Sequence, residues 1–431
     1  MINLSSLFNR SLKTLPIVAA SLFSRGVPFL VIPVLTSYLT PSEYGYLAYI
    51  ATIVAIAAIF SGLQPHLFLI VKWGVLDRDE KAEFTTLSIL SSALLGVIVC
   101  GLILVVVRPL MSIEISFFTV IMISILGVLR SVFLIFDAIL QSEKKLMQLS
   151  GLLVLQTIIH YSLAVYLLEY CFQSWHGKFY AEFSAVAIIC VITVFSMRNI
   201  GNYSLNFKFS QITRLFKYSF PLSFHVLSIV VMGGIDRIMI VEMIGLESAG
   251  VYAVAYVFGS IIGIFHNALL KVWNPAFYKL LKNVTDPWKL SIVSATYAYI
   301  FFSIVVLVVF VYFAPVLYSH MVPIEYVSGG PIIGIIALGY TVEAVRKLFV
   351  AYLFAKDKVK LIAAISFFAA LLNIILNYYL IPVYGAHGAA WATVLTYMVI
   401  TILTVGISTR FYSMPWGSYS KIRGRISEFV S

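Results

Sequence analysis

The chain has 431 residues, of which 61% are hydrophobic and only 11% are charged, and its mean hydropathy is +1.01. A soluble protein has about 25% charged residues, so this composition excludes a soluble globular domain and favours helices that span a membrane. The formal net charge of +11 must then be interpreted from its distribution along the chain.

Twelve apolar runs of about 20 residues, bounded by charged and turn-forming residues, predict twelve transmembrane helices. The first run follows Arg10 and Lys13 but is too long for the apolar core of a secretion signal, and no small-residue cleavage site ends it. We therefore expect it to be retained. In chain order the predicted helices cover residues 15–39, 45–70, 84–107, 115–140, 147–168, 178–197, 217–241, 249–270, 290–314, 329–355, 360–381 and 386–409.

The basic residues between these runs are unevenly distributed. With a cytoplasmic N-terminus, 22 of the 29 lysines and arginines fall in cytoplasmic segments, and only Arg108 and Lys178 fall on the opposite side. Because lysine and arginine favour the cytoplasmic side of short loops, both termini are predicted to be cytoplasmic. The net charge is then explained by topology and by contact with membrane lipids, and nucleic acid is not an expected partner.

A short turn recurs after half the chain. The segment TSYLTPSEYGYLA (residues 36–48) is followed by EMIGLESAGVYAVA (residues 242–255), with matching residues 205 positions apart. Each half contains six predicted helices, so both halves begin on the same side of the membrane and form a parallel repeat. The matched pairs are Leu39 and Ile244, Gly45 and Gly250, and Ala48 and Ala253.

The predicted fold is an all-α polytopic membrane protein in which two six-helix lobes are related by a parallel pseudo-twofold repeat. The first lobe covers residues 1–205, the second covers residues 206–409, and residues 410–431 form a basic cytoplasmic tail. The longest polar connection, residues 198–217, joins the lobes. A second glycine turn, VYGAHGAAWAT (residues 383–393), separates the last two helices.

Three segments carry a resemblance to a known family. SRGVPFLVIPVLTSYLTPSEYGYLA (residues 24–48), IDRIMIVEMIGLESAGVYAVAY (residues 235–256) and YLIPVYGAHGAAWAT (residues 379–393) resemble patterns of the polysaccharide transporters of the O-antigen flippase type. These belong to the multidrug/oligosaccharidyl-lipid/polysaccharide exporter superfamily. Each segment is loose by itself, and their combination with twelve predicted helices makes the resemblance specific.

The resemblance implies a flippase without catalytic chemistry in the bacterial cytoplasmic (inner) membrane. Its substrate would be an undecaprenyl-diphosphate-linked oligosaccharide, such as the O-antigen unit of lipopolysaccharide, moved between leaflets by alternating access. Membrane lipids and other membrane proteins of polysaccharide assembly would be further partners. No cofactor or metal is expected, since no metal-ligand spacing and no phosphate-binding GxxxxGK[ST] loop is found, but proton or sodium coupling remains open.

Two alternative functions follow from the same topology. A multidrug or cation exporter of the superfamily would need an acidic, apolar cavity, whereas the predicted helices contain more basic than acidic residues. A membrane-embedded polysaccharide polymerase would need a long external loop with charged catalytic motifs, and the predicted outer loops are short.

Charged residues inside the predicted helices are the candidate site residues. Each costs at least about 2.5 kcal/mol near the bilayer centre, so each should face a cavity or a partner. The basic surplus suits a diphosphate. The predicted substrate-binding residues are Arg25, Arg130, Arg346 and Lys347, and the predicted coupling or gating residues are Glu343, Asp236, Arg237 and Asp137.

Sequence spacing gives each candidate an expected partner. Arg25 has no acidic residue within helical reach and is the strongest candidate for a phosphate or sugar-acid contact. Arg130 and Asp137 share a helix face but lie about 10 Å apart along the axis, so Arg130 is expected to line a cavity or to pair with another helix.

The remaining candidates form two local groups. Glu343 can pair with Arg346 and Lys347, three and four residues on, or it can be a proton or sodium site with Arg346 holding substrate. Asp236 and Arg237 are adjacent, so they are expected to contact different neighbours in a gating or a structural salt bridge.

Overall fold

The computed structural model describes residues 4–196, 203–204, 208–282 and 286–417. Within these ranges the chain consists of α-helices, short 3-10 and π turns and connecting loops, with no β-strand. The helices are α1 Leu4–Tyr38, α2 Pro41–Gly62, α3 Pro65–Lys72, α4 Arg78–Leu102, α5 Phe117–Ser142, α6 Leu146–Tyr170, α7 Trp175–Ser196, α8 Phe209–Met243, α9 Leu246–Lys282, α10 Asp286–Met321, α11 Gly330–Ala355 and α12 Val359–Phe411.

The predicted membrane helices are confirmed as helices. Among the described residues, ten helices are long and apolar enough to cross a membrane. One of the ten, α12, contains two predicted spans, and α11 has 26 residues but also carries Glu343, Arg346 and Lys347. The chain is therefore an all-α, multi-pass membrane protein.

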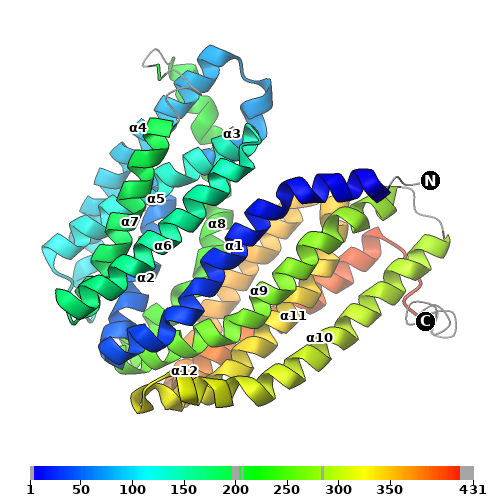
Figure 1. Cartoon of the computed structure of the whole chain (residues 1–431). Helices are drawn as coiled ribbons and strands as arrows, with labels where there is room; N and C mark the ends of the chain where they lie inside the picture. Colours follow the sequence, from blue (N-terminus) through cyan, green and yellow to red (C-terminus); the bar gives the residue numbers. More distant parts are fainter. Residues whose placement is uncertain (1–3, 197–202, 205–207, 283–285, 418–431) are drawn as a thin grey trace. The chain divides into compact units, whose positions relative to one another are not determined.

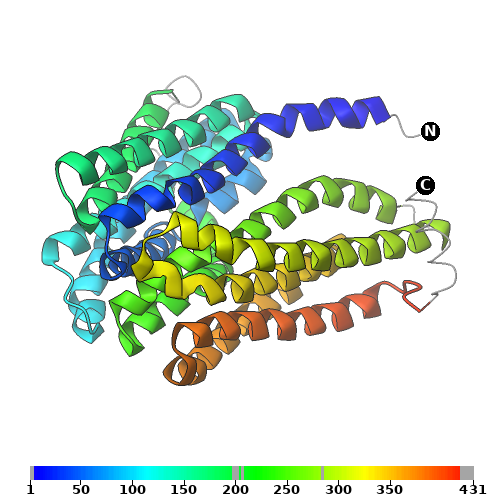
Figure 2. The ribbon, with the colours of Figure 1, turned by 60° about the horizontal axis from the view of Figure 1, so that its bottom comes forward.

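The two halves of α12 meet at the predicted glycine turn. Gly385 has φ 60° and ψ −142°, a conformation that a residue with a β carbon rarely adopts. A β carbon at Gly388 would collide with the carbonyl group of Leu380, so the two arms reverse direction tightly. Figure 2 shows the arms in orange and red, with the reversal between them.

The prediction of one continuous helix over residues 45–70 was wrong, because the helix is interrupted within this range. α2 ends at Gly62, and Leu63 and Gln64 take left-handed backbone angles with φ 49° and 58° before Pro65 begins α3. Proline lacks the N–H of a helical hydrogen bond and disfavours helical angles at the residue before it. Pro65 was the sequence signal for this break.

The first repeated turn is a capped helix start. Thr40 caps α2 by accepting a hydrogen bond from the Glu43 N–H, the Glu43 carboxylate accepts one from the Thr40 N–H, and Pro41 occupies the first helical position. Close packing explains the glycines of the repeat. A β carbon at Gly45 would collide with the Leu246 carbonyl oxygen, and one at Gly250 would collide with that of Pro41.

The chain divides into two compact units, Met1–Gly250 and Val251–Ser431. In the first unit α2 packs against α4, α5 and α8, and α6 packs against α1 and α7; in the second unit α11 packs against α10 and α12. Figure 1 shows α5, α6 and α7 side by side in the first unit. The predicted lobe boundary at residues 205 and 206, and the basic residues at 421, 423 and 425, lie outside the described residues.

Candidate functional site

Arg130 of α5 forms an ion pair with Glu182 of α7 in the first unit. The side chains are 32% and 19% exposed, so the pair is only partly screened by solvent. This ion pair is the second of the two arrangements expected for Arg130, pairing with another helix, and the cavity-lining role stays a prediction. The acidic partner was missed by the sequence analysis, because residues 52 positions apart have no spacing that predicts contact. With Glu182 included, the interiors of the predicted helices contain five basic and four acidic residues, apart from the lysines at the first positions of three predicted helices.

No ion pair between Asp137 and Arg130 is found among the described residues, which agrees with the separation predicted from their positions along α5. The Oδ2 atom of Asp137 instead accepts a hydrogen bond of 2.8 Å from Nε2 of Gln141, one turn further on. The half-buried carboxylate is therefore engaged within its own helix.

Asp236 and Arg237 of α8 contact each other in addition to their other interactions, a contact that their spacing did not predict. The Arg237 N–H donates to Asp236 Oδ1 at 2.8 Å, and Arg237 Nη1 lies 3.5 Å from the same oxygen. Nη1 also donates to the carbonyl oxygen of Gly233 at 2.5 Å. The long arginine side chain folds back along its helix, and this reach brings adjacent residues together although their β carbons point apart.

Glu242, at the end of α8, connects three parts of the first unit. Tyr49 of α2 donates its hydroxyl to Oε1 at 2.5 Å. The N–H of Ser112, in the α4–α5 connection, donates to Oε2 at 2.9 Å, and its hydroxyl contacts the same oxygen. Glu242 was not among the residues predicted from the sequence, although an acidic residue at the end of a membrane helix was the available signal.

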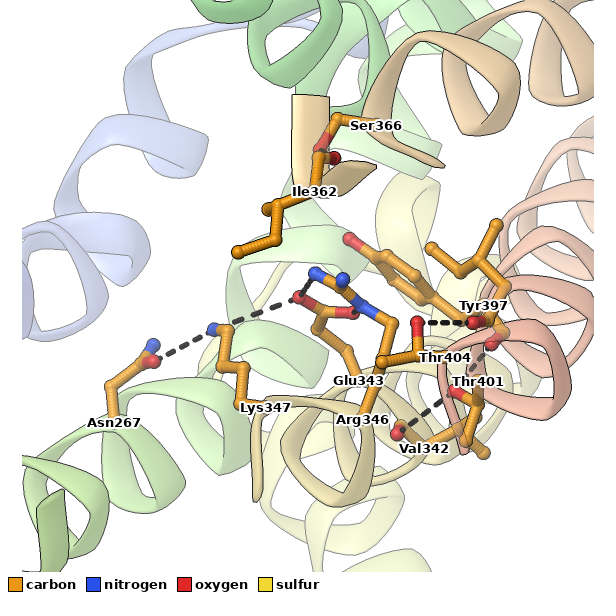
Figure 3. A network of polar contacts seen from close by, with 11 residues as sticks. Asn267, Val342, Glu343, Arg346, Lys347, Ile362, Ser366, Tyr397, Thr401 and Thr404 are labelled. Carbon is orange, nitrogen blue, oxygen red and sulfur yellow. Dashed lines mark hydrogen bonds and ion pairs between the residues drawn. The ribbon is translucent and has the colours of Figure 1, made fainter. Parts of the chain in front are cut away.

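The second unit contains the charged triad of α11, shown in Figure 3. Arg346 donates to both carboxylate oxygens of Glu343, through Nε at 2.6 Å and Nη2 at 2.7 Å. Lys347 Nζ lies 3.9 Å from Glu343 and donates to Asn267 Oδ1 of α9 at 2.9 Å. The predicted self-pairing is confirmed. Glu343 and Arg346 are 10% and 14% exposed, whereas Lys347 is 37% exposed.

Arg25 is arranged differently from these paired residues. It is exposed on α1, and within the described part of the chain no hydrogen bond or ion pair of its guanidinium is found. The structure therefore groups the candidates into the Arg130 pair, the Asp236–Arg237 pair and the α11 triad, and it leaves Arg25 as an exposed cation. No group of three or more His, Cys, Asp or Glu side chains within the described ranges is placed to hold a metal ion.

The long apolar helices, with charged residues paired inside them, define a polytopic membrane protein. Residues 13–281 match the family described as "Polysaccharide biosynthesis protein", and the chain belongs to that family. No curated protein matches the chain.

Solved transporter structures share the fold over nearly the whole chain. The lipid II flippase MurJ, in an inward closed conformation, is 16% identical with a TM-score of 0.65, covering 91% of this chain and 87% of that one. A multidrug resistance MATE family transporter of the MOP superfamily, in an inward-facing conformation, is 15% identical with a TM-score of 0.57, covering 94% and 96%. A MOP superfamily transporter from Pyrococcus furiosus is 14% identical with a TM-score of 0.55, covering 93% and 96%. Identities this low show a shared fold.

Proposed function

We propose that the protein is a flippase that moves an undecaprenyl-diphosphate-linked oligosaccharide across the bacterial cytoplasmic membrane. The oligosaccharide would be the repeat unit of O-antigen or of a similar surface polysaccharide. Membership of the polysaccharide biosynthesis family and a fold shared with a lipid II flippase support this proposal. The proposal gives no residue a catalytic role.

The exposed guanidinium of Arg25 is the observation that carries the proposal. It lies in the apolar part of α1, where an unpaired cation is costly unless it meets an anion or water. A guanidinium presents a planar set of donors that matches phosphate oxygens, and a diphosphate brings the negative charge that the described surroundings do not supply. We assign Arg25 to the diphosphate of the cargo.

The other cations would act by exchange of partners. Arg346 is held by both oxygens of Glu343, so a diphosphate must replace that carboxylate before Arg346 can bind it. Protonation of Glu343 would remove its charge and free Arg346, which would couple proton uptake to substrate binding. Lys347 is more exposed, and it contacts both the neutral amide of Asn267 and, at 3.9 Å, Glu343, so the same release would free it in part. Arg130, paired with Glu182, would follow the same rule as Arg346.

The function is tested by deleting the chain in its native host and measuring surface polysaccharide on gels and with antibody. We expect loss of surface polysaccharide and accumulation of the lipid-linked oligosaccharide. In complemented cells with equal membrane abundance, Arg25→Ala should abolish export, and Arg25→Lys should restore part of it because the positive charge is retained.

Two results would count against the proposal. Unchanged surface polysaccharide in the deletion strain would remove the flippase assignment, and cation or drug sensitivity in the same strain would favour the exporter alternative. Full export with both Arg25 variants would remove the role of Arg25. Arg78→Ala is a matched control because Arg78 is an exposed arginine at the start of α4 that has no role in the proposal.

A further inference from the structure

The first unit contains an apolar pocket to which the proposed function gives no role. It lies between α2, α8 and the end of α4, where the helix continues as a π turn, η2 Ile103–Val107. All thirteen residues that line it are apolar, among them Ile53, Ala57, Ile98 and Ile238. Such a lining offers a polar ligand or a water molecule no side-chain hydrogen bond, so the pocket suits a hydrocarbon.

The size of the pocket indicates a single chain. Its volume is about 430 Å³. A methylene group is about as large as a water molecule, which occupies roughly 30 Å³, so the pocket holds about 14 such groups. This corresponds to one chain of about three five-carbon isoprene units. A phospholipid would place one of its two acyl chains there and leave the other in the bilayer, so the volume sets one chain for the pocket and the proposed polyprenyl cargo identifies which chain it is.

One end of the pocket adjoins polar groups. Its lining residue Met111 precedes Ser112, and Ile53 and Ile238 lie one helical turn from Tyr49 and Glu242 respectively. These three polar residues are the hydrogen-bonded group described above. On the predicted topology this end faces the outer leaflet. The pocket therefore runs from a polar outer end toward the apolar middle of the membrane, as a lipid in the outer leaflet does.

A cation lies in the chain beside this polar end. Arg108 stands between the lining residues Val107 and Met111, and it is one of only two basic residues on the predicted outer side. It is half-buried, and no hydrogen bond or ion pair of its side chain is found in the described ranges. Its guanidinium can bind a phosphate oxygen, so the pocket and Arg108 together match an anionic lipid that places one chain in the pocket.

We infer that the α2–α4–α8 pocket binds the head-proximal isoprene units of the polyprenyl carrier, with its phosphate at Arg108, on the outer side of the membrane. The inference rests on the proposed function, because that function supplies the polyprenyl cargo. It adds a tail site to the charged site proposed for the diphosphate and oligosaccharide during translocation.

The test uses the purified full chain in nanodiscs and two photoactivatable lipids. One is undecaprenyl phosphate with a diazirine in an isoprene unit near the phosphate, and the other is phosphatidylglycerol with a diazirine in an acyl chain. We expect the polyprenyl probe to label peptides of α2, α4 and α8, and an excess of unlabelled phosphatidylglycerol to leave that labelling in place. Equal labelling of these peptides by the phospholipid probe would overturn the inference.

Substitutions locate the site. Ala57→Trp and Ile98→Trp fill the pocket from different helices and should each lower labelling about tenfold, the loss expected when about two buried methylene groups are excluded. Leu94→Trp is the matched control, because Leu94 is a 66% exposed residue of α4 that does not line the pocket. Unchanged labelling in a monodisperse pocket variant would overturn the inference.

Arg108 is tested separately. Arg108→Ala should weaken labelling by the polyprenyl phosphate probe and leave labelling by the matching polyprenol unchanged, because only the phosphate is lost as a partner. Equal effects on both probes would contradict the phosphate contact. These measurements use purified protein, so they are distinguishable from failure of the proposed function, which is read as unchanged surface polysaccharide in the deletion strain.

Discussion

The two units hold an arginine in apolar helices in different ways. In the second unit Arg346 is bound by Glu343 three residues earlier on the same helix, through two hydrogen bonds and with both side chains at least 86% covered. In the first unit Arg130 is bound by Glu182 from another helix, and the arginine is 32% exposed. A same-helix pair forms with its helix, whereas the cross-helix pair requires α5 and α7 to pack correctly. The difference makes one pair a local feature and the other a tertiary one.

The largest effect on stability is expected from Glu343→Gln. The neutral amide would leave Arg346 and Lys347 without their shared negative charge inside α11, and we expect the free energy of unfolding to fall by about 3 kcal/mol. Denaturant unfolding of the detergent-solubilised protein measures this change. Glu247→Gln is the control, since Glu247 is exposed. A loss no larger than in the control would show that the α11 triad does not stabilise the fold.

Glu182→Gln should lower the free energy of unfolding by less, about 2 kcal/mol. It leaves only Arg130 without its partner, and that side chain is already partly exposed. The double variant Glu182→Gln with Arg130→Met removes both charges and should recover most of the loss. A double-mutant cycle gives the coupling energy of the pair directly. Additive effects of the two single substitutions would mean that the observed contact contributes no coupling.

The smallest effects on stability are expected from replacing each arginine with lysine, and these two substitutions distinguish the two ion-pair geometries. Arg346→Lys replaces the bidentate hydrogen bond to Glu343, which an ammonium group cannot reproduce. Arg130→Lys can keep the single contact with Glu182. We expect Arg346→Lys to destabilise the protein by about 1 kcal/mol more than Arg130→Lys does. Thermal unfolding of the two variants in parallel tests this, and equal shifts in Tm would contradict the distinction.

Local spacing and composition allowed much of the fold to be predicted. Apolar runs of the right length gave the helices, the VYGAHGAAWAT turn gave the reversal at Gly385, and the separations of three and four residues gave the contacts of Glu343 with its basic neighbours. The break at Leu63 and Gln64 was missed because long apolar runs flank it on both sides, although the local sequence SGLQPH (residues 61–66) and its proline Pro65 signalled it.

Contacts between distant segments could not be predicted in the same way. The partner of Arg130 lies on another helix, and the hydrogen bonds of Glu242 depend on how α2 and the α4–α5 connection pack against α8. The repeat of Gly45 and Gly250 was visible in the sequence, but its physical reason was not. Only the structure shows that α2 and the start of α9 approach so closely there that a β carbon on either residue would collide with a carbonyl oxygen.

The flippase proposal is tested most directly by transport in reconstituted vesicles. A fluorescent polyprenyl-diphosphate oligosaccharide is placed in both leaflets, a membrane-impermeant reagent quenches the accessible fraction, and the rate at which the protected fraction becomes accessible is measured. We expect the wild-type protein to raise this rate above that of protein-free vesicles, and we expect Arg25→Ala to return it to that baseline while Arg25→Lys retains part of it. A wild-type rate equal to that of protein-free vesicles would contradict the proposed function.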